Sequence, residues 1–526
     1  MKVDNAIILA DGYGSRFVPL TYDLPKGLIS VNGEPMIERQ ISQLKEKNIN
    51  EIIIIVGYLK EKFDYLIDKY EIKLIYNPEF TIKDNLSSLY FARNYLRNTY
   101  ILLADFWMRN NIFNSTEERS WYSCIYEVGF TSGWCVKTSM NGRIKKVNIG
   151  GCDSRIMYGP AFLTQKFSEK FACKIEEYYI KPGRENYVWE NVYIKEIKHF
   201  DLFVNKQEKD NVYRIKSLED LRKLDPNYYI EKPNVLIKTI EDVFKVKEKE
   251  IVDIKYIKTG MTNKSFGFSI NKNPYIFRQP GEGTEMLIDR NKEKEVYFVI
   301  KNLGISETVI HFDEEAGYKI SEFFDNAKNT DPKNRDDLEK SMDVLRKFHK
   351  TGLIVSRVFK IDKEINRYLK LCNKKNAIRY SDIDEVNQKM KHLIKILKKL
   401  KVQNVLCHID SNPDNYIKLR NGEIKIIDWE YAGMCDPIID ISMYSIYSYY
   451  TKQEMVELLK IYLQREPNKN ELIRLYIYVA LSGYLWALWT EYKYTFEIEF
   501  GDYGMKMYRY AKDFYKNINQ ELLNER

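Results

Sequence analysis

The stretch 405–431 constrains this chain most, because it holds two acids and an amide at fixed spacing. Asp410 and Asn415 precede an Asn-Gly pair at 421–422, and a second β-rich run then ends at Asp428. This pattern predicts two strands joined by a tight turn. Phosphoryl transfer needs one carboxylate to accept the hydroxyl proton, and an amide and a second carboxylate to hold Mg²⁺. A polar loop beside a hairpin is the alternative, but the compound motif favours a kinase over it.

Upstream segments can supply the other parts of an ATP site. A strand–turn–strand at 254–277, with Asn263 in its polar turn, can cover the phosphates with backbone amides. The next strand should present a cation paired with an acid on a helix, and Arg278 and Glu293 fit. Roughly residues 240–515 resemble the choline kinase branch of the aminoglycoside-phosphotransferase-like kinases, in which an Arg at this position is usual. By position, the resemblance implies a hinge where Glu322 contacts adenine.

An apolar helix predicted at 475–492 carries Trp486, Trp489 and Tyr492 at a spacing of three. Such a stripe is usually core. The resemblance to choline kinases implies instead a pocket for a trimethylammonium group, which aromatic faces bind well. Tyr503 would line that pocket, and Glu430 is a further candidate carboxylate for substrate or metal.

The N-terminus begins with a buried strand and a glycine-containing loop. Glycines after a strand let backbone N–H groups approach phosphates. Arg16 and Lys26 add positive charge where a pyrophosphate would leave. We expect seven residues to contact this nucleotide: Leu9, Ala10, Gly12, Gly14, Ser15, Asn85 and Ser87.

A βα rhythm follows the loop and predicts a doubly wound sheet, with Asp105 at a strand C-terminus as a ligand for Mg²⁺. The loop resembles the sugar-phosphate and phosphocholine nucleotidyltransferase superfamily. Over roughly residues 4–225 the likeness is to bacterial CTP:phosphocholine cytidylyltransferases. Two positions depart from that family. Asp11 replaces a small residue and either turns away from the phosphates or contacts a base or metal, and Glu190 stands where a second Asp metal ligand is usual.

Phosphocholine carries a quaternary ammonium, which aromatic faces and one nearby carboxylate can hold. Trp107, two residues beyond Asp105, and Trp134 with Glu127 are candidates. Each tryptophan could equally fill a core.

Composition sets the limits of this interpretation. The 526 residues divide into a predicted domain at 1–228, a turn-rich linker at 229–236 and a second domain at 237–526. A net charge of +8 without a nucleic-acid-binding motif argues against nucleic-acid partners. Seven cysteines without paired spacing predict a reducing cytoplasm, and we expect neither a signal peptide nor an apolar run of spanning length. The oligomeric state stays open, with a homodimer as one alternative.

The two resemblances together imply an α/β fold with a doubly wound, Rossmann-like nucleotidyltransferase domain followed by a bilobal, protein-kinase-like domain. The kinase would make phosphocholine from choline and ATP, and the transferase would convert it with CTP to CDP-choline and pyrophosphate, each with Mg²⁺. One alternative is a sugar-1-phosphate or phosphoethanolamine nucleotidyltransferase joined to an aminoglycoside-type kinase. Another is a regulatory binding protein with a degraded transferase, for which Asp11 and Glu190 are the only hints.

Overall fold

The computed structural model describes residues 1–225, 228, 234–257, 263–281, 284, 287–400, 402–496 and 500–523. Contacts divide the chain into two compact units, residues 1–256 and 257–526. Residues 229–233 of the predicted linker lie outside the described residues, and helix α8 (Val235–Phe244) begins within the remainder.

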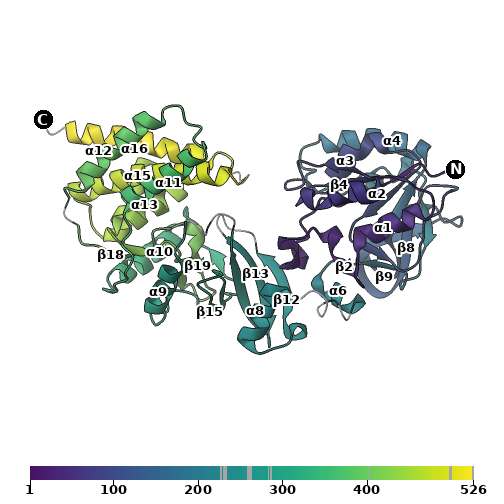
Figure 1. Ribbon diagram of the computed structural model, residues 1–526, viewed down its shortest axis with the longest axis horizontal. Coiled ribbons are helices and arrows are strands. Elements are labelled where there is room, and N and C mark those ends of the chain that lie inside the picture. The colour runs from purple at the N-terminus through teal and green to yellow at the C-terminus, as the bar shows by residue number, and fades with distance from the viewer. Residues whose placement is uncertain are drawn as a thin grey trace. The chain divides into compact units, whose positions relative to one another are not determined.

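A seven-stranded sheet in the order β10-β8-β9-β6-β1-β4-β5 forms the centre of the first unit (Figure 1). Its strands are β1 (Asn5–Leu9), β4 (Glu51–Val56), β5 (Lys73–Tyr76), β6 (Thr99–Leu103), β8 (Trp121–Thr138), β9 (Ile144–Leu163) and β10 (Phe203–Lys206). β1 pairs in parallel with both β4 and β6. The loops after these strands therefore leave the sheet at one edge, where ligands bind in such folds.

Helices cover both faces of this sheet. Ile8 and Ile54 pack on one face with α1 (Met36–Lys45) and α2 (Tyr65–Tyr70). Ile7 and Ile53 pack on the other with α3 (Asn85–Ala92), α4 (Gln165–Tyr179) and α5 (Trp189–Lys195). A strand buried on both sides is apolar throughout, which explains the runs AIIL and IIIIV. The predicted doubly wound fold is confirmed.

Short elements complete the first unit near the ligand edge. β7 (Phe106–Met108) pairs with β11 (Val212–Arg214), which aligns Arg214 with Phe106, the residue after Asp105. β2 (Ser30–Val31) and β3 (Glu34–Pro35) form a small hairpin, and α6 (Leu218–Leu224) follows β11 along the chain.

The second unit has the predicted two-part, kinase-like fold. Four strands of its sheet have the order β13-β14-β16-β15, and α9 (Arg290–Ile300) follows β14 along the chain. The strands are β13 (Asn263–Ile270), β14 (Asn273–Pro280), β15 (Val309–Phe312) and β16 (Lys319–Glu322), and β12 (Val252–Ile257), which spans the boundary between the units, precedes them along the chain.

The C-terminal part of the second unit is mostly helical and contains the predicted hairpin. β19 (Tyr416–Lys418) and β20 (Ile424–Ile426) pair antiparallel, β17 (Lys328–Asn329) extends this sheet, and β18 (Val405–Cys407) pairs with β21 (Gly433–Cys435). The helices are α10 (Arg335–His349), α11 (Ile361–Lys374), α12 (Ile383–Leu397), α13 (Ile438–Tyr447), α14 (Lys452–Leu463), α15 (Lys469–Tyr494) and α16 (Tyr503–Leu523).

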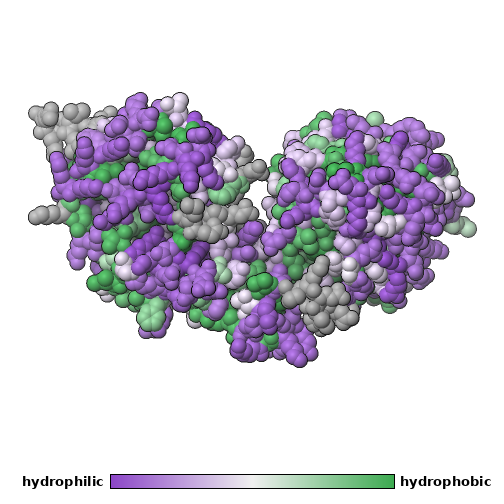
Figure 2. All heavy atoms as spheres, viewed as in Figure 1, coloured by the Kyte–Doolittle hydropathy of each residue, from purple (hydrophilic) through white to green (hydrophobic). Residues whose placement is uncertain are grey.

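α15 is the core helix of this part, and α11, α13 and α16 pack around it (Figure 1). By length and composition α15 could cross a membrane, contrary to the expectation from sequence, but 89% of its most apolar stretch is buried inside the unit. Hydrophilic side chains predominate on the visible face of each unit (Figure 2).

Close packing of α15 on α16 depends on Gly483. A Cβ at Gly483 would lie 2.6 Å from the Met507 carbonyl oxygen, which belongs to the backbone of α16 and cannot easily yield. We expect Gly483→Ala to destabilise the second unit by about 1–3 kcal/mol, as overpacking does. Thermal unfolding of the full chain measures this.

The neighbouring residue provides the control. The buried Ser482 hydroxyl has no hydrogen-bond partner among the described residues, so Ser482→Ala removes nothing that packing needs. Equal melting temperatures for the two variants would contradict the importance of the close approach at Gly483.

Candidate active sites

A cavity of about 690 Å³ opens at the ligand edge of the first unit. The loop after β1 forms one wall, the segment leading into α3 a second, and the ends of β6 and β11 the rest. Six of the seven predicted nucleotide contacts line it, together with the predicted catalytic residues Arg16 and Lys26 and the predicted metal ligand Asp105. The six are Leu9, Ala10, Gly12, Gly14, Ser15 and Asn85. Gly14 has φ +61°, and a Cβ there would lie 2.9 Å from the Cβ of Lys26, so glycine allows Lys26 to approach the loop.

Asp105 is the centre of charge in this cavity. Its Oδ2 accepts hydrogen bonds from Lys26 Nζ at 2.5 Å and Arg214 Nε at 3.2 Å. Burial would raise the pKa of Asp105, but the charges of Lys26 and Arg214 outweigh burial and leave the pKa below its ordinary value. Oδ1 is buried without a hydrogen-bond partner among the described residues. An ionised carboxylate with one uncommitted oxygen fits Mg²⁺, which prefers such ligands.

The two residues that depart from the family motif both turn toward protein groups. Asp11 Oδ2 accepts from Asn77 Nδ2 and Ser88 Oγ, each at 2.6 Å. Burial raises the pKa of Asp11, while these two hydrogen bonds act against that rise. Glu190 Oε1 accepts from the Tyr122 hydroxyl at 2.8 Å, and burial raises the pKa of Glu190 to about 7.

Glu190 remains a predicted metal ligand. It is buried in the first turn of α5 and does not lie among the described residues that line the cavity. Its Oε2 has no described partner, so one oxygen is uncommitted, as in Asp105. Both carboxylates influence Arg214, whose pKa is raised because their charges outweigh the effect of burial.

Other predicted residues of the first unit have partners of their own. Ser87 accepts from Asn77 at 2.9 Å, and Asn85 Oδ1 accepts from the backbone N–H of Trp189 at 3.0 Å. The Arg39 guanidinium lies 4.5 Å from the centroid of the Trp107 ring, and Glu127 forms an ion pair with Lys209 at 2.7 Å. Trp134 packs against the core on the α3 face. The three proposed phosphocholine residues (Trp107, Trp134 and Glu127) therefore do not meet in the cavity, and their roles stay predictions.

Sequence reasoning missed the two cations that come from β11 and the residues after it. Arg214 bonds Asp105, and both Arg214 and Lys216 line the cavity. The alternation of basic residues in RIK is the only local signal, and it is common in exposed strands.

In the second unit the predicted catalytic residues come together at the hairpin. Asn415 directly precedes β19 and Asp428 follows β20, and the backbone N–H of Ile427 donates to the Asn415 carbonyl oxygen at 2.9 Å. Asn415 Nδ2 donates to the Asp410 carbonyl oxygen at 2.9 Å and to Asp410 Oδ2 at 3.3 Å. The Asn415 side-chain carbonyl stays available to a metal, as the kinase chemistry requires.

Asp410 lies in an environment that suits a general base. It is half-buried, and the loss of solvent around the carboxyl group raises its pKa to about 7. Tyr447 on α13 donates its hydroxyl to Asp410 Oδ1 at 2.6 Å, a contact that sequence reasoning did not foresee. A base with a pKa near neutrality balances proton affinity against the ionised fraction.

A network of buried charges connects the sheet, α9 and the loop after β20. Arg278 Nη1 lies 2.6 Å from Glu293, 3.1 Å from Asp428 and 3.7 Å from Glu430, so the ion pair expected between Arg278 and Glu293 is present. Arg290 contacts Glu430 at 3.0 Å. Burial raises the pKa of Glu430, whereas the charge of Arg278 holds the pKa of Glu293 below its usual value despite burial.

Two further predicted residues border this network. Asn263 Nδ2 donates to Glu430 Oε2 at 3.1 Å, so the structure brings Glu430 to the charge network rather than to the aromatic residues of α15. Glu322, at the end of β16, is exposed and lines a second cavity of about 660 Å³ beside β15. Contact of Glu322 with adenine stays a prediction.

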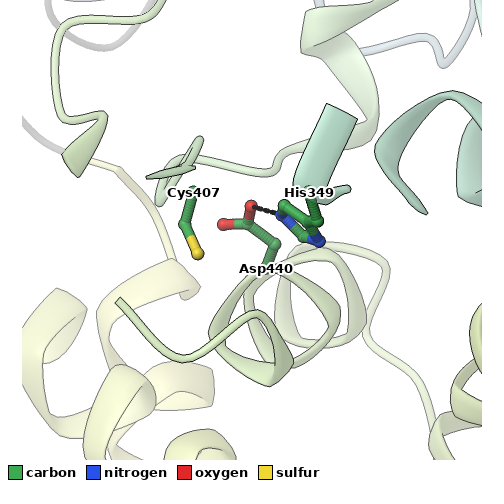
Figure 3. A group of neighbouring side chains, drawn as sticks. All are labelled: His349, Cys407 and Asp440. Atoms are coloured by element: carbon green, nitrogen blue, oxygen red, sulfur yellow. Dashed lines mark hydrogen bonds and ion pairs between the residues drawn. The ribbon is translucent and has the colours of Figure 1, made fainter. Parts of the chain in front are cut away.

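Asp440 on α13 holds the loop that carries Asp410 by hydrogen bonds to the loop backbone. Its two oxygens accept from the backbone N–H groups of His408 at 2.8 Å and Ile409 at 2.7 Å. His349 Nε2 lies 2.9 Å from Asp440, and Figure 3 shows both side chains beside Cys407. Because the Asp440 carboxylate is already bonded to the loop backbone and to His349, we infer that Asp440 and His349 order the loop that carries Asp410.

Five aromatic side chains form a cluster next to Asp410: Tyr431, Tyr447, Trp486, Trp489 and Tyr503. Ring centroids lie 5.7 Å apart for Tyr431 and Trp486, 5.9 Å for Tyr447 and Trp486, and 5.8 Å for Trp486 and Trp489. Through the Tyr447 hydroxyl this aromatic cluster contacts Asp410, the predicted base. The ring of Tyr492 packs instead near Tyr368 and Phe496.

Comparison with known proteins agrees with this geometry. A model of the choline/ethanolamine kinase family matches residues 254–512, and a nucleotidyl transferase model matches residues 5–231. The chain is 38% identical to choline-phosphate cytidylyltransferase of Streptococcus pneumoniae, over 42% of this chain and 96% of that protein. It is 35% identical to 2-aminoethylphosphonate cytidylyltransferase of Lancefieldella rimae, over 43% and 93%. The crystal structure of choline kinase LicA from Streptococcus pneumoniae matches at 31% identity with a TM-score of 0.48, covering 53% of this chain and 98% of that one.

The first unit is thus a nucleotidyltransferase and the second a kinase, fused in one chain. Through its first unit the chain belongs to the family of choline-phosphate cytidylyltransferase, and residues 254–512 of its second unit match the choline/ethanolamine kinase model.

The position of Asp410 predicts a selective loss. Asp410→Asn keeps the shape but cannot accept a proton, so we expect phosphorylation by ATP to fall about 10²–10⁴-fold while nucleotidyl transfer continues. Separate assays of the two reactions on the full chain measure this. Asp414→Asn changes an exposed acid on the same loop and is the matched control. Parallel loss of both activities in a folded Asp410→Asn variant would disprove the assignment of separate sites.

For the first unit we expect the opposite selectivity, a loss of nucleotidyl transfer with phosphorylation kept. Asp105→Asn removes the charge that Lys26 and Arg214 share, and with it the proposed metal ligand. We expect nucleotidyl transfer to fall at least about 10²-fold, because charge stabilisation of the transferring phosphate is lost. Phosphorylation by the second unit should be unchanged. Near-normal pyrophosphate release by a folded variant would remove Asp105 from the site; Asp153→Asn, an exposed acid, is the control.

Proposed function

We propose that the chain is a bifunctional enzyme. The second unit phosphorylates choline with ATP, and the first transfers CMP from CTP to the resulting phosphocholine, which gives CDP-choline and pyrophosphate. The observation that carries the proposal is the aromatic cluster beside Asp410. A trimethylammonium cannot donate strong hydrogen bonds, and ring faces are its natural partners.

Each residue of the proposed kinase site has a role in the reaction. Choline would lie with its cationic end against Trp486 and Trp489 and its hydroxyl at Asp410, which accepts the proton. Asp428 and Asn415 would hold Mg²⁺, which neutralises charge on the transferred phosphoryl group. Arg278, fixed by Glu293, supplies positive charge beside Asp428.

In the first unit the loop after β1 would bind the triphosphate of CTP. Lys26 and Arg16 would stabilise the departing pyrophosphate, while Asp105 and Glu190 would hold Mg²⁺ at the α-phosphate. The seven cysteines are all unpaired, which supports the proposal of a reducing, cytoplasmic location.

The relatives leave ethanolamine, phosphoethanolamine and a phosphonate as rival substrates. Pyrophosphate release from CTP with phosphocholine, phosphoethanolamine or 2-aminoethylphosphonate ranks the acceptors of the first unit. We expect phosphocholine to rank first by kcat/KM. A phosphonate ranked above phosphocholine would refute the assignment.

For the kinase, the decisive variants are Trp486→Leu and Trp489→Leu. Each keeps apolar bulk but removes a π-face worth about 0.5–2 kcal/mol to a bound cation. We expect the KM for choline to rise from severalfold to tens of fold, with little change in the KM for ATP. The preference for choline over ethanolamine should narrow.

Tyr492→Leu is the matched control, because its ring lies on the same helix but packs near Tyr368. It should affect melting more than choline binding. If Trp486→Leu instead lowers the melting temperature and leaves the choline KM unchanged, the aromatic cluster is core.

A further inference from the structure

Asp11 is an acid in a site built for a polyanion. It lies two residues beyond the end of β1, is only 7% exposed, and lines the cavity of the first unit. Among the described residues no Lys or Arg pairs with it, and its Oδ2 is held by Asn77 and Ser88. No described side chain donates to Oδ1. The described side chains therefore hold one oxygen of the carboxyl group and leave the other without a side-chain donor.

Strand order separates Asp11 from the phosphate end of the cavity. Lys26 and Arg214 gather at Asp105, which follows β6. Asp11 follows β1, but its side-chain partner Asn77 follows β5, and in the order β6-β1-β4-β5 that strand lies on the side of β1 away from β6. An uncompensated carboxylate repels phosphates, so the triphosphate belongs with the cations and the base with Asp11.

An aromatic surface lies beside Asp11. A Cβ at Gly57 would lie 2.6 Å from the Phe80 ring and 2.8 Å from the Asp11 carbonyl oxygen, so the ring and this turn are neighbours. Phe80 also lines the cavity. A flat ring next to a fixed hydrogen-bond acceptor is suited to a nucleobase.

We propose that Asp11 reads the base of the nucleotide: Oδ1 accepts a hydrogen bond from the exocyclic amino group of cytosine and so selects CTP against UTP. Cytosine presents an amino donor where uracil presents a carbonyl oxygen, and that oxygen would face the carboxylate as a second acceptor. The inference rests on the proposed function of the first unit and adds its specificity-determining residue.

The two donors make one substitution especially informative. In Asp11→Asn the carbonyl oxygen would stay against Asn77 and Ser88, which turns the amide NH₂ into the cavity. The NH₂ group would then donate a hydrogen bond to the uracil oxygen and would disfavour the cytosine amino group. We expect the wild-type chain to prefer CTP over UTP by about tenfold to a hundredfold, and Asp11→Asn to narrow this ratio to near one or invert it.

Calorimetric binding of CTP and UTP to the full chain, with Mg²⁺ and without phosphocholine, gives the ratio. Asp11→Ala removes both the acceptor for cytosine and the repulsion of uracil, so it should narrow the ratio of CTP to UTP binding toward one without inverting it. This variant replaces Asp11→Asn if Asp11→Asn does not fold. Asp84→Asn removes another acid from the cavity and should leave the ratio of CTP to UTP binding unchanged. This control distinguishes recognition of the base by Asp11 from a non-specific effect of negative charge in the cavity.

Equal binding of CTP and UTP by the wild-type chain would overturn the proposal. So would an unchanged ratio in a folded Asp11 variant. A chain that selects CTP but releases no pyrophosphate with phosphocholine would refute the proposed reaction and leave the reading of the base intact.

Discussion

Arg278 is buried, and three carboxylates from different parts of the second unit surround its guanidinium. Glu293 comes from α9, and Asp428 and Glu430 from the loop after β20, so this one cation connects the sheet with the catalytic hairpin. Breaking such a buried arrangement by removing one partner costs about 3–5 kcal/mol, because an uncompensated charge is left behind. The geometry of the proposed ATP site is therefore maintained by mutual neutralisation of charge.

The first unit uses the same physics on another fold. Asp105 is buried at the end of a parallel strand, and Lys26 and Arg214 keep it ionised there. Parallel pairing of β1 with β6 places the glycine loop and Asp105 at one edge, so that the proposed phosphate-binding amides and the proposed metal ligand line one cavity. Each unit thus pre-arranges charge before a nucleotide arrives, which lowers the cost of reorganisation during the reaction.

Those parts of the candidate sites whose residues lie close together in the sequence could be predicted, because the chemistry requires them at a fixed spacing. The hairpin brings Asn415 and Asp428 together because the strands are short and adjacent in sequence, and the Arg278–Glu293 pair follows from the kinase pattern. Arg214 could not be predicted, since 109 residues separate it from Asp105 and only the pairing of β7 with β11 unites them. Tyr447 was missed for the same reason. Tyr492 lies six positions from Trp486, about 120° around the helix, and so packs near another neighbour.

The central claim is that one chain converts choline to CDP-choline through phosphocholine, and phosphorus NMR of a single reaction mixture tests it. The purified chain would be incubated with choline, ATP, CTP and Mg²⁺, with CTP omitted from a parallel sample. The account predicts a transient phosphocholine signal that gives way to CDP-choline and pyrophosphate, and phosphocholine alone when CTP is absent. Failure of phosphocholine to form, or its accumulation without CDP-choline while CTP is present, would contradict the account.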